Sequence, residues 1–173
     1  MSEYGINSIS SLSFREGVRC RIQMYLGSDD VEGVYQALKE IINNSTDEAL
    51  AGYGKKIEIE LDKNNGISVR DYGRGVPFGI RENGENVLVS IYTQSHTGGK
   101  FNHDAYKNAS GLNGVGGSCV CLSSKKFCVI SYRDGKYAKA EFDKGILSNY
   151  TEGKTKEKNG TYVWFIPDEE VFS

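Results

Sequence analysis

The chain has 173 residues, of which 38% are hydrophobic and 25% charged, and its formal net charge is −2. This length and composition predict one soluble globular domain with a hydrophobic core. The charge gives no global electrostatic case for binding nucleic acid or a membrane, no apolar run is long enough for a transmembrane helix, and the first residues do not resemble a signal peptide.

The N-terminal part predicts one long helix. Residues 1–30 are mixed in character, and residues 24–30 are expected to form a loop that leads into the helix. Residues 31–51 carry apolar side chains at helical spacing. The apolar face holds Val34, Leu38, Ile41, Ile42, Ser45 and Ala49. The polar stripe, at spacings of three and four residues, holds Glu40, Asn44, Asp47 and Glu48.

A β-hairpin is expected next. Residues 57–62 alternate apolar and polar side chains, and the sequence NNG at 64–66 is a tight-turn signal. The second strand ends at Asp71, and the alternation puts this residue on the apolar side with Ile67 and Val69. A carboxylate that faces a core is costly unless something pairs with it. Asp71 therefore needs a partner, which is most often a backbone amide or a neighbouring base.

The middle of the chain changes in character. Residues 85–93 show helical spacing of apolar side chains, whereas residues 94–117 contain six glycines and no clear period. A connection of this length is usually functional or disordered. It ends in Gly-x-x-Gly-x-Gly and runs into a predicted short helix at GSCVCLSS. Such glycines allow backbone N–H groups to approach a phosphate at a helix N-terminus.

The last third predicts a β-meander. Strands are expected at 126–133, 136–143 and 160–167, and Asp134-Gly135 is expected to join the first two. The lysines at 154, 156 and 158 are interpreted as a solvated turn, with a partner site as the alternative. Together the elements predict an α+β domain, with helices packed on one face of an antiparallel sheet.

Cysteine spacing gives no sign of a metal site or a disulfide framework. None of the four cysteines forms a C-x-x-C pair, and the two histidines lie outside any zinc-like spacing. The expected state is therefore buried free thiols in a reducing cytoplasm. The cysteines are Cys20, Cys119, Cys121 and Cys128.

Five segments, in this order, resemble the nucleotide-binding motifs of type IIA DNA topoisomerase ATPase domains, found in the B-type subunits of gyrase and topoisomerase IV. The wider superfamily, called GHKL, includes the ninety-kilodalton chaperones, histidine kinases and mismatch-repair ATPases. The resemblance covers nearly the whole chain, and TGGKF and DEALAG favour the topoisomerase branch. It implies a two-layer α/β sandwich (the Bergerat or GHKL ATP-binding fold), with a mostly antiparallel mixed sheet and helices on one face. The segments are EIINNSTDEALAG, DYGRGVP, HTGGKF, GLNGVGG and GTYVWFIPD.

The resemblance implies a role for each matching residue. Asp71 would accept the adenine amine with the help of a water and Thr161, and Gly75 would let the ring lie against backbone. Asn44 would be the Mg²⁺ ligand, and Glu40 would be the general base that acts on the attacking water. The slot is expected to be lined by Val69, Val76, Ile91 and Val163. The other expected nucleotide-binding residues are Glu48, Arg74, Pro77, Lys100, Tyr106, Gly111, Leu112, Asn113, Gly114, Val115, Gly116 and Arg133.

Two of these residues have a further expected contact. Glu48 is expected to pair with Arg74 at the rim of the pocket. Arg133 matches an arginine that contacts aminocoumarin-type drugs outside the adenine slot. The sequence also departs from the family pattern at four positions, which suggests a divergent member rather than an inactive one. Ile22 replaces a proline, Asn43 and Tyr72 replace aspartates, and Asn113 replaces a histidine.

The resemblance also implies a domain organisation. Residues 1–173 are expected to be one ATP-binding domain, with a short N-terminal arm at 1–14 and an ATP lid at 94–117. The transducer domain, whose lysine contacts the γ-phosphate, is expected to be absent, so the chain is interpreted as an excised domain that is monomeric and weakly active. In its parent protein, ATP and Mg²⁺ would drive DNA gate closure and strand passage in the cytoplasm. The expected partners are a second B-type subunit, the DNA-cleaving A-type subunit and duplex DNA, with no membrane.

Two alternatives stay open. The domain could be a nucleotide-sensing module with little turnover, because the transducer lysine is expected to be missing. It could also be another GHKL ATPase, such as a kinase or a chaperone. A histidine kinase would need a phosphoacceptor histidine region, and the sequence supplies none.

Overall fold

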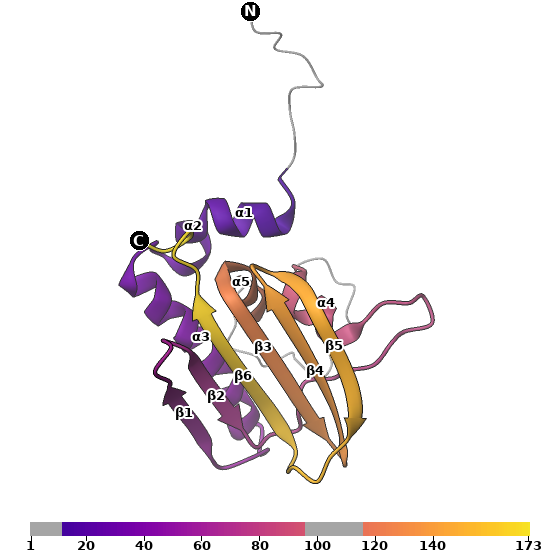
Figure 1. Ribbon diagram of the computed structural model, residues 1–173. Coiled ribbons are helices and arrows are strands. Elements are labelled where there is room, and N and C mark those ends of the chain that lie inside the picture. The colour runs from indigo at the N-terminus through magenta and orange to yellow at the C-terminus, as the bar shows by residue number, and fades with distance from the viewer. Residues whose placement is uncertain (1–11, 96–115) are drawn as a thin grey trace, which may run out of the picture.

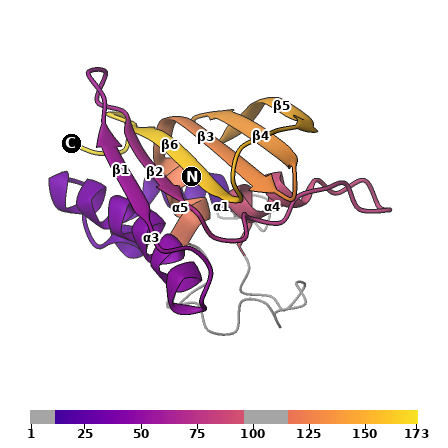
Figure 2. The same cartoon turned by 90° about the horizontal axis from the view of Figure 1, so that it is seen from below.

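A six-stranded sheet forms one layer of the structure, and the helices lie against one of its faces (Figures 1 and 2). The computed structural model describes residues 12–95 and 116–173. Within these residues the strands are β1 (Ile57–Leu61), β2 (Ile67–Asp71), β3 (Ser124–Arg133), β4 (Lys136–Asp143), β5 (Ile146–Lys154) and β6 (Gly160–Pro167). The helices are α1 (Phe14–Cys20), α2 (Ile22–Leu26), α3 (Val31–Leu50), α4 (Val87–Thr93) and α5 (Gly116–Ser123).

The last strand of the chain lies in the middle of the sheet. The strand order is β1-β2-β6-β3-β4-β5, and each neighbouring pair is antiparallel. Inward-facing side chains of the central strands, such as Phe127, Val129 and Phe165, are at most 1% exposed. They belong to one core with α5, in which every residue from 118 to 123 is buried. The predicted α+β class, with helices on one face of the sheet, is confirmed.

Two predicted elements match the structure closely. Helix α3 occupies 31–50, and the Asp30 side chain caps it by accepting the backbone N–H of Glu32 at 2.9 Å. The predicted hairpin is also present, because β1 and β2 pair in antiparallel register from Ile57 opposite Asp71. Asn65 in the connecting turn has a φ of +62°, a conformation that asparagine tolerates better than most residues. The helical spacing and the turn signal were therefore sufficient to predict helix α3 and the β1–β2 hairpin.

Three elements escaped the sequence-based prediction. Helices α1 and α2 lie in the mixed N-terminal stretch, so the loop predicted at 24–30 is wrong for residues 24–26. Helices of seven and five residues contain too few turns for a clear apolar period. Strand β5 is an edge strand with mostly exposed side chains, so it lacks the alternation of a half-buried strand. All four cysteines are free, as predicted, but only Cys119 and Cys121 are buried, whereas Cys128 is half-buried and Cys20 is exposed.

No helix within the described residues is both long and apolar enough to cross a membrane.

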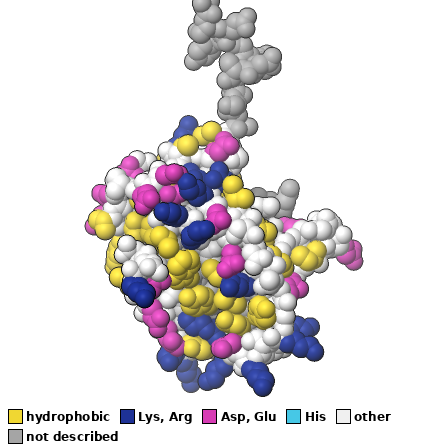
Figure 3. All heavy atoms as spheres, viewed as in Figure 1, with side chains coloured by type: hydrophobic (Ala, Val, Ile, Leu, Met, Phe, Trp, Pro, Cys, Tyr) yellow, Lys and Arg dark blue, Asp and Glu magenta, His cyan; other side chains and the backbone are white. Residues whose placement is uncertain are grey.

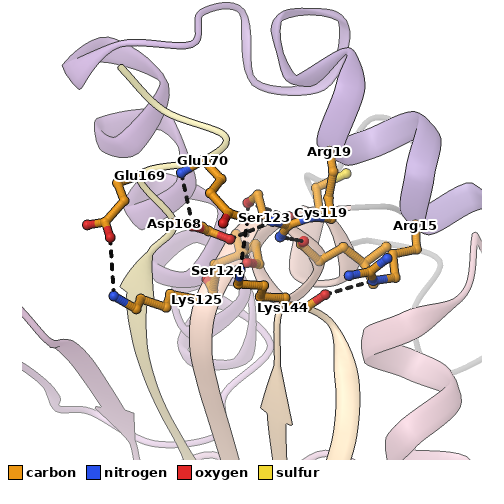
Figure 4. Close-up of polar contacts among 12 residues, drawn as sticks. Arg15, Arg19, Cys119, Ser123, Ser124, Lys125, Lys144, Asp168, Glu169 and Glu170 are labelled. Atoms are coloured by element: carbon orange, nitrogen blue, oxygen red, sulfur yellow. Dashed lines mark hydrogen bonds and ion pairs between the residues drawn. The ribbon is translucent and has the colours of Figure 1, made fainter.

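A largely buried arginine, whose side chain is 12% exposed, joins α1 to the ends of α5 and β6 (Figure 4). The Arg19 guanidinium donates one hydrogen bond from Nη1 to the carbonyl oxygen of Leu122 at 2.9 Å and another from Nη2 to the Asp168 carboxylate. The Asp168 side chain is only 1% exposed, and its other oxygen accepts the N–H of Glu170 at 3.0 Å. Burial alone would raise the pKa of Asp168, but the hydrogen bonds from Arg19 and Glu170 bring it below the ordinary value. This contact therefore depends on a charged carboxylate.

Asp168→Asn is expected to lower the free energy of unfolding by about 2 kcal/mol at neutral pH, because a charge-assisted hydrogen bond is lost. The folded-state pKa of Asp168 is lower than its unfolded value of about 3.9. The stabilisation is therefore complete above that value and is lost as the pH falls through the folded-state pKa. Urea unfolding at neutral pH and near pH 3 measures this change.

The matched control is Asp143→Asn, because Asp143 forms an ion pair with Lys126 in which both side chains are about half exposed. Exposed pairs of this kind contribute at most about 1 kcal/mol. A stability difference between wild type and Asp168→Asn that is equally large at both pH values would contradict the assignment.

Candidate functional site

The Asp71 carboxylate is buried, and three hydrogen-bond donors already surround it. Oδ1 accepts the backbone N–H of Gly73 at 3.0 Å and that of Thr161 at 3.1 Å. Oδ2 accepts the Ser45 hydroxyl at 2.8 Å. A carboxylate offers about four acceptor positions, so the described residues leave one of them open, on Oδ2. The predicted inward direction of Asp71 is confirmed, and backbone amides are only part of its partner set.

Thr161 links this carboxylate to the turn that follows β2. Its hydroxyl oxygen accepts the backbone N–H of Val76 at 3.1 Å, while its own N–H points to Asp71. Ser131, on the neighbouring strand β3, donates its hydroxyl to the carbonyl of Val76 at 2.5 Å. The turn after β2 is therefore held from both β3 and β6.

Gly75 lies where this turn passes against the end of β3. Its φ is +81°, and a Cβ at this position would lie 2.6 Å from the carbonyl oxygen of Tyr132. Both the conformation and the close approach require glycine. Arg133, the next residue of β3, donates its guanidinium to the carbonyl of Gly75 at 2.7 Å. Arg133 thus fixes the same turn, a contact that sequence reasoning did not foresee.

The predicted pair between Glu48 and Arg74 is present. The Glu48 carboxylate accepts Nη2 of Arg74 at 2.7 Å, Nε at 3.1 Å and the backbone N–H at 3.0 Å. Burial raises the pKa of Glu48, but these bonds and the charge of Arg133 bring it below the ordinary value. The Arg74 guanidinium also lies 4.3 Å from the centre of the Tyr53 ring. The end of α3 is therefore fixed to the turn after β2.

Glu40 and Asn44 flank the first turn of α5. A Cβ built on Gly116 would lie 2.3 Å from a Glu40 carboxylate oxygen, and one built on Gly117 would lie 3.7 Å from the Asn44 amide nitrogen. The first N–H groups of a helix have no partner within the helix, and such an end attracts anions. The structure therefore brings the polar stripe of α3 to the end of the glycine-rich segment. Gln36 donates to Glu40 at 3.1 Å and orients its carboxylate.

The hydrophobic residues predicted to line the slot divide into two groups. Val69 and Val163 are opposite each other on β2 and β6, and their side chains are 1% and 3% exposed. Val76 and Ile91 are half-buried, as is Pro77 beside the turn.

The predicted lid at 94–117 and arm at 1–14 fall largely outside the described residues. The predicted site residues that lie there are Lys100, Tyr106, Gly111, Leu112, Asn113, Gly114 and Val115.

Ser45 contacts the candidate site through Asp71, and sequence reasoning missed this contact. The helical pattern placed it correctly on the buried face of α3, where it is 4% exposed. A lone hydroxyl on an apolar helix face needs a hydrogen-bond partner, and Asp71 was the inward carboxylate that lacked one. The contact between Ser45 and Asp71 could therefore have been predicted from the sequence.

A magnesium ion would find few protein ligands here. Among the described residues, no three His, Cys, Asp or Glu side chains gather as a metal site. Mg²⁺ is commonly bound through one or two protein groups plus phosphates and water. The exposed amide of Asn44 beside the start of α5 fits such a site, because its carbonyl oxygen is a hard ligand next to an anion-binding helix end.

The sequence and the fold of the chain both resemble those of known proteins. A family model described as "Histidine kinase-, DNA gyrase B-, and HSP90-like ATPase" matches residues 29–171. The chain is 42% identical to the B-type subunit of DNA topoisomerase 4 from Enterococcus faecalis and 42% identical to that from Mycoplasma capricolum, with 99% of this chain covered in each case. It spans only 26% and 27% of the length of these relatives. A solved structure, the 43K ATPase domain of Thermus thermophilus gyrase B in complex with an aminocoumarin, matches with a TM-score of 0.77 and 36% identity, over 92% of this chain and 40% of that one.

Proposed function

We propose that the chain binds Mg²⁺-ATP and hydrolyses it as the ATPase domain of a type IIA topoisomerase B-type subunit. The chain belongs to the histidine kinase-, DNA gyrase B- and HSP90-like ATPase family, and the proposal starts from that membership. The observation that carries this proposal is the buried Asp71 carboxylate with one acceptor position left open by the described residues. An acceptor held in this way suits a flat ring with an N–H donor. Adenine offers such a donor in its exocyclic amine.

The opposite end of the site supports phosphate chemistry. Glu40 and Asn44 lie at the start of α5, where unpaired backbone N–H groups can meet phosphate oxygens. Asn44 would hold the magnesium ion, which when bound neutralises charge on the phosphates. Glu40 would accept a proton from the attacking water, as a general base does. Phosphoryl transfer to water needs mainly positioning and charge stabilisation, and these residues supply both.

The activity of a longer protein is part of the same proposal. ATP turnover would drive DNA gate closure and strand passage in the cytoplasm, together with a second B-type subunit, a DNA-cleaving A-type subunit and duplex DNA. The names of the relatives that align over the whole chain support this interpretation. They also disfavour a nucleotide-sensing module, a kinase or a chaperone. The isolated domain is proposed to be a weakly active monomer. Arg133 is proposed to contact bound aminocoumarin-type drugs beside the Gly75 turn.

The test is a comparison of two nucleotides. Inosine triphosphate has a carbonyl oxygen where ATP has the amine, so its acceptor would face the acceptor of Asp71. We expect the wild-type chain to bind Mg²⁺-ATP more tightly than inosine triphosphate, by about tenfold or more, in a calorimetric titration. A mismatched buried polar pair costs about 1–3 kcal/mol, and tenfold corresponds to about 1.4 kcal/mol. Equal affinities would contradict the adenine assignment, and the absence of binding by both would contradict the whole proposal.

A further inference from the structure

Arg70 lies on the face of the sheet that the helices leave open, one residue before Asp71. This face carries hydrophobic side chains bordered by charged ones (Figure 3). The guanidinium of Arg70 lies between two tyrosine rings, 4.3 Å from the centre of Tyr72 and 4.7 Å from that of Tyr132. A planar cation between two aromatic faces is held by cation–π attraction and loses little freedom when it forms hydrogen bonds.

The same guanidinium joins two separate segments of the chain. Nη1 donates to the carbonyl oxygen of Asp71, at the end of β2. Nη2 donates to the carbonyl oxygen of Lys158 at 2.7 Å, in the turn that precedes β6. These segments lead directly to Asp71 and Thr161, whose carboxylate and backbone N–H meet on the other face of the sheet. One side chain therefore fixes the two strand ends that carry the candidate adenine-binding pair.

The ladder between β2 and β6 does not extend to this pair. Its register runs from Ile67 opposite Phe165 to Arg70 opposite Tyr162, and it ends there. Asp71 pairs instead with Ile57 of β1, and Thr161 pairs with Ser131 of β3. No ladder pairing joins the two residues to each other, so local contacts, including those of Arg70, help to set their separation.

Gly160 shows how closely the chain passes the guanidinium. Its φ is +143°, and a Cβ at this position would lie 2.2 Å from Nη1 of Arg70 and 2.1 Å from the carbonyl oxygen of Asp71. Only a residue without a side chain can bring the backbone this near. A shift of the guanidinium would therefore be transmitted directly to Gly160 and to its neighbour Thr161.

We propose that Arg70 is a positioning residue for nucleotide recognition. It acts from the open face of the sheet and holds Asp71 and Thr161 at the separation that adenine recognition requires. This inference rests on the proposed function, because it needs Asp71 to bind the adenine amine. Lysine cannot replace the arginine, because its compact ammonium group lacks the planar fork that contacts two rings and bridges two carbonyls at once.

The test compares ATP with inosine triphosphate in Arg70→Ala, Arg70→Lys and wild type, with Lys56→Ala as the matched control. Lys56 also lies beside the Tyr72 ring, at 5.9 Å, but its ion pair is with Glu58. We expect the ratio of ATP affinity to inosine triphosphate affinity to fall about tenfold in Arg70→Ala and at least about threefold in Arg70→Lys. Lys56→Ala is expected to keep the wild-type ratio, and thermal unfolding identifies variants that are folded.

The possible results separate this inference from the proposed function. If the wild type does not prefer ATP, the adenine assignment itself fails. If the wild type prefers ATP and a folded Arg70→Ala keeps the same ratio, the inference is wrong. An equal loss of affinity for both nucleotides also overturns it, because that pattern reports general damage rather than misplacement of Asp71. If Arg70→Ala does not fold, an unchanged ratio in folded Arg70→Lys is the decisive negative result.

Discussion

Asp71→Asn is expected to weaken ATP binding by about 2–4 kcal/mol, the cost of a buried polar mismatch, while the domain stays folded. The asparagine carbonyl can replace Oδ1 and still accept the backbone N–H groups of Gly73 and Thr161. The amide nitrogen then replaces Oδ2, beside Ser45. The serine hydroxyl can rotate and accept this N–H, so the fold keeps its contacts. The adenine amine cannot adapt in this way, because it would face another donor.

Calorimetric titration with Mg²⁺-ATP measures this loss, and circular dichroism reports whether the variant is folded. Ser45→Ala is the matched control, because it removes one donor to Asp71 but leaves the acceptor in place. Its ATP affinity is expected to stay within about threefold of wild type, well under the tenfold that corresponds to about 1.4 kcal/mol. Near-native ATP affinity in a folded Asp71→Asn variant would show that adenine is bound elsewhere.

Glu40→Gln is expected to lower ATP turnover by roughly 10²–10⁴-fold and to leave ATP affinity nearly unchanged. Glutamine keeps the size of the side chain and can still accept the Gln36 amide, but it cannot take a proton from water. Asn44→Ala should behave differently, because loss of a metal ligand weakens Mg²⁺-ATP binding itself. The two residues are one helical turn apart and both lie beside α5, so a shared structural defect would affect both constants in both variants.

Single-turnover hydrolysis with protein in excess gives the chemical step, and the same variants in a longer B-type subunit give the coupled rate. The expected pattern for Glu40→Gln is a turnover defect of at least about a hundredfold with ATP affinity within about threefold of wild type. Surviving turnover would mean that the base is another residue. Asp47, on the same polar stripe and half-buried, would then be the next candidate.

The sequence predicted those features that depend on local period. Helix α3 and the β1–β2 hairpin have strong repeats and a clear turn signal, and the inward direction of Asp71 follows from that hairpin. Ile22, which departs from the family proline, is the first residue of α2. A proline is well accommodated at that position, because the first N–H of a helix has no partner. The family proline was therefore a signal for the start of α2 that the sequence-based prediction did not use.

The features that were not predicted depend on contacts between distant segments. The family resemblance placed Thr161 beside Asp71 in one adenine site, but the direct bond from the Thr161 N–H to Asp71 joins residues 90 positions apart. No local pattern in either segment indicates that β6 pairs with β2. The contact between Arg133 and Gly75 spans 58 positions. The stack of Arg70 between two tyrosines needs the same strand order. Sequence patterns give the direction of a side chain along its own element, but its partners follow from tertiary arrangement.

The central position of β6 has a consequence for the order of events during protein synthesis. Until residues 160–167 leave the ribosome, the nascent chain has β2 and β3 without the strand that lies between them. Two unpaired strand edges, each able to pair with another chain, are then exposed together. Arrival of the last strand closes both edges and completes the surroundings of Asp71 in the same step. A ligand that binds at Asp71 therefore cannot assist the folding steps that precede the pairing of β6.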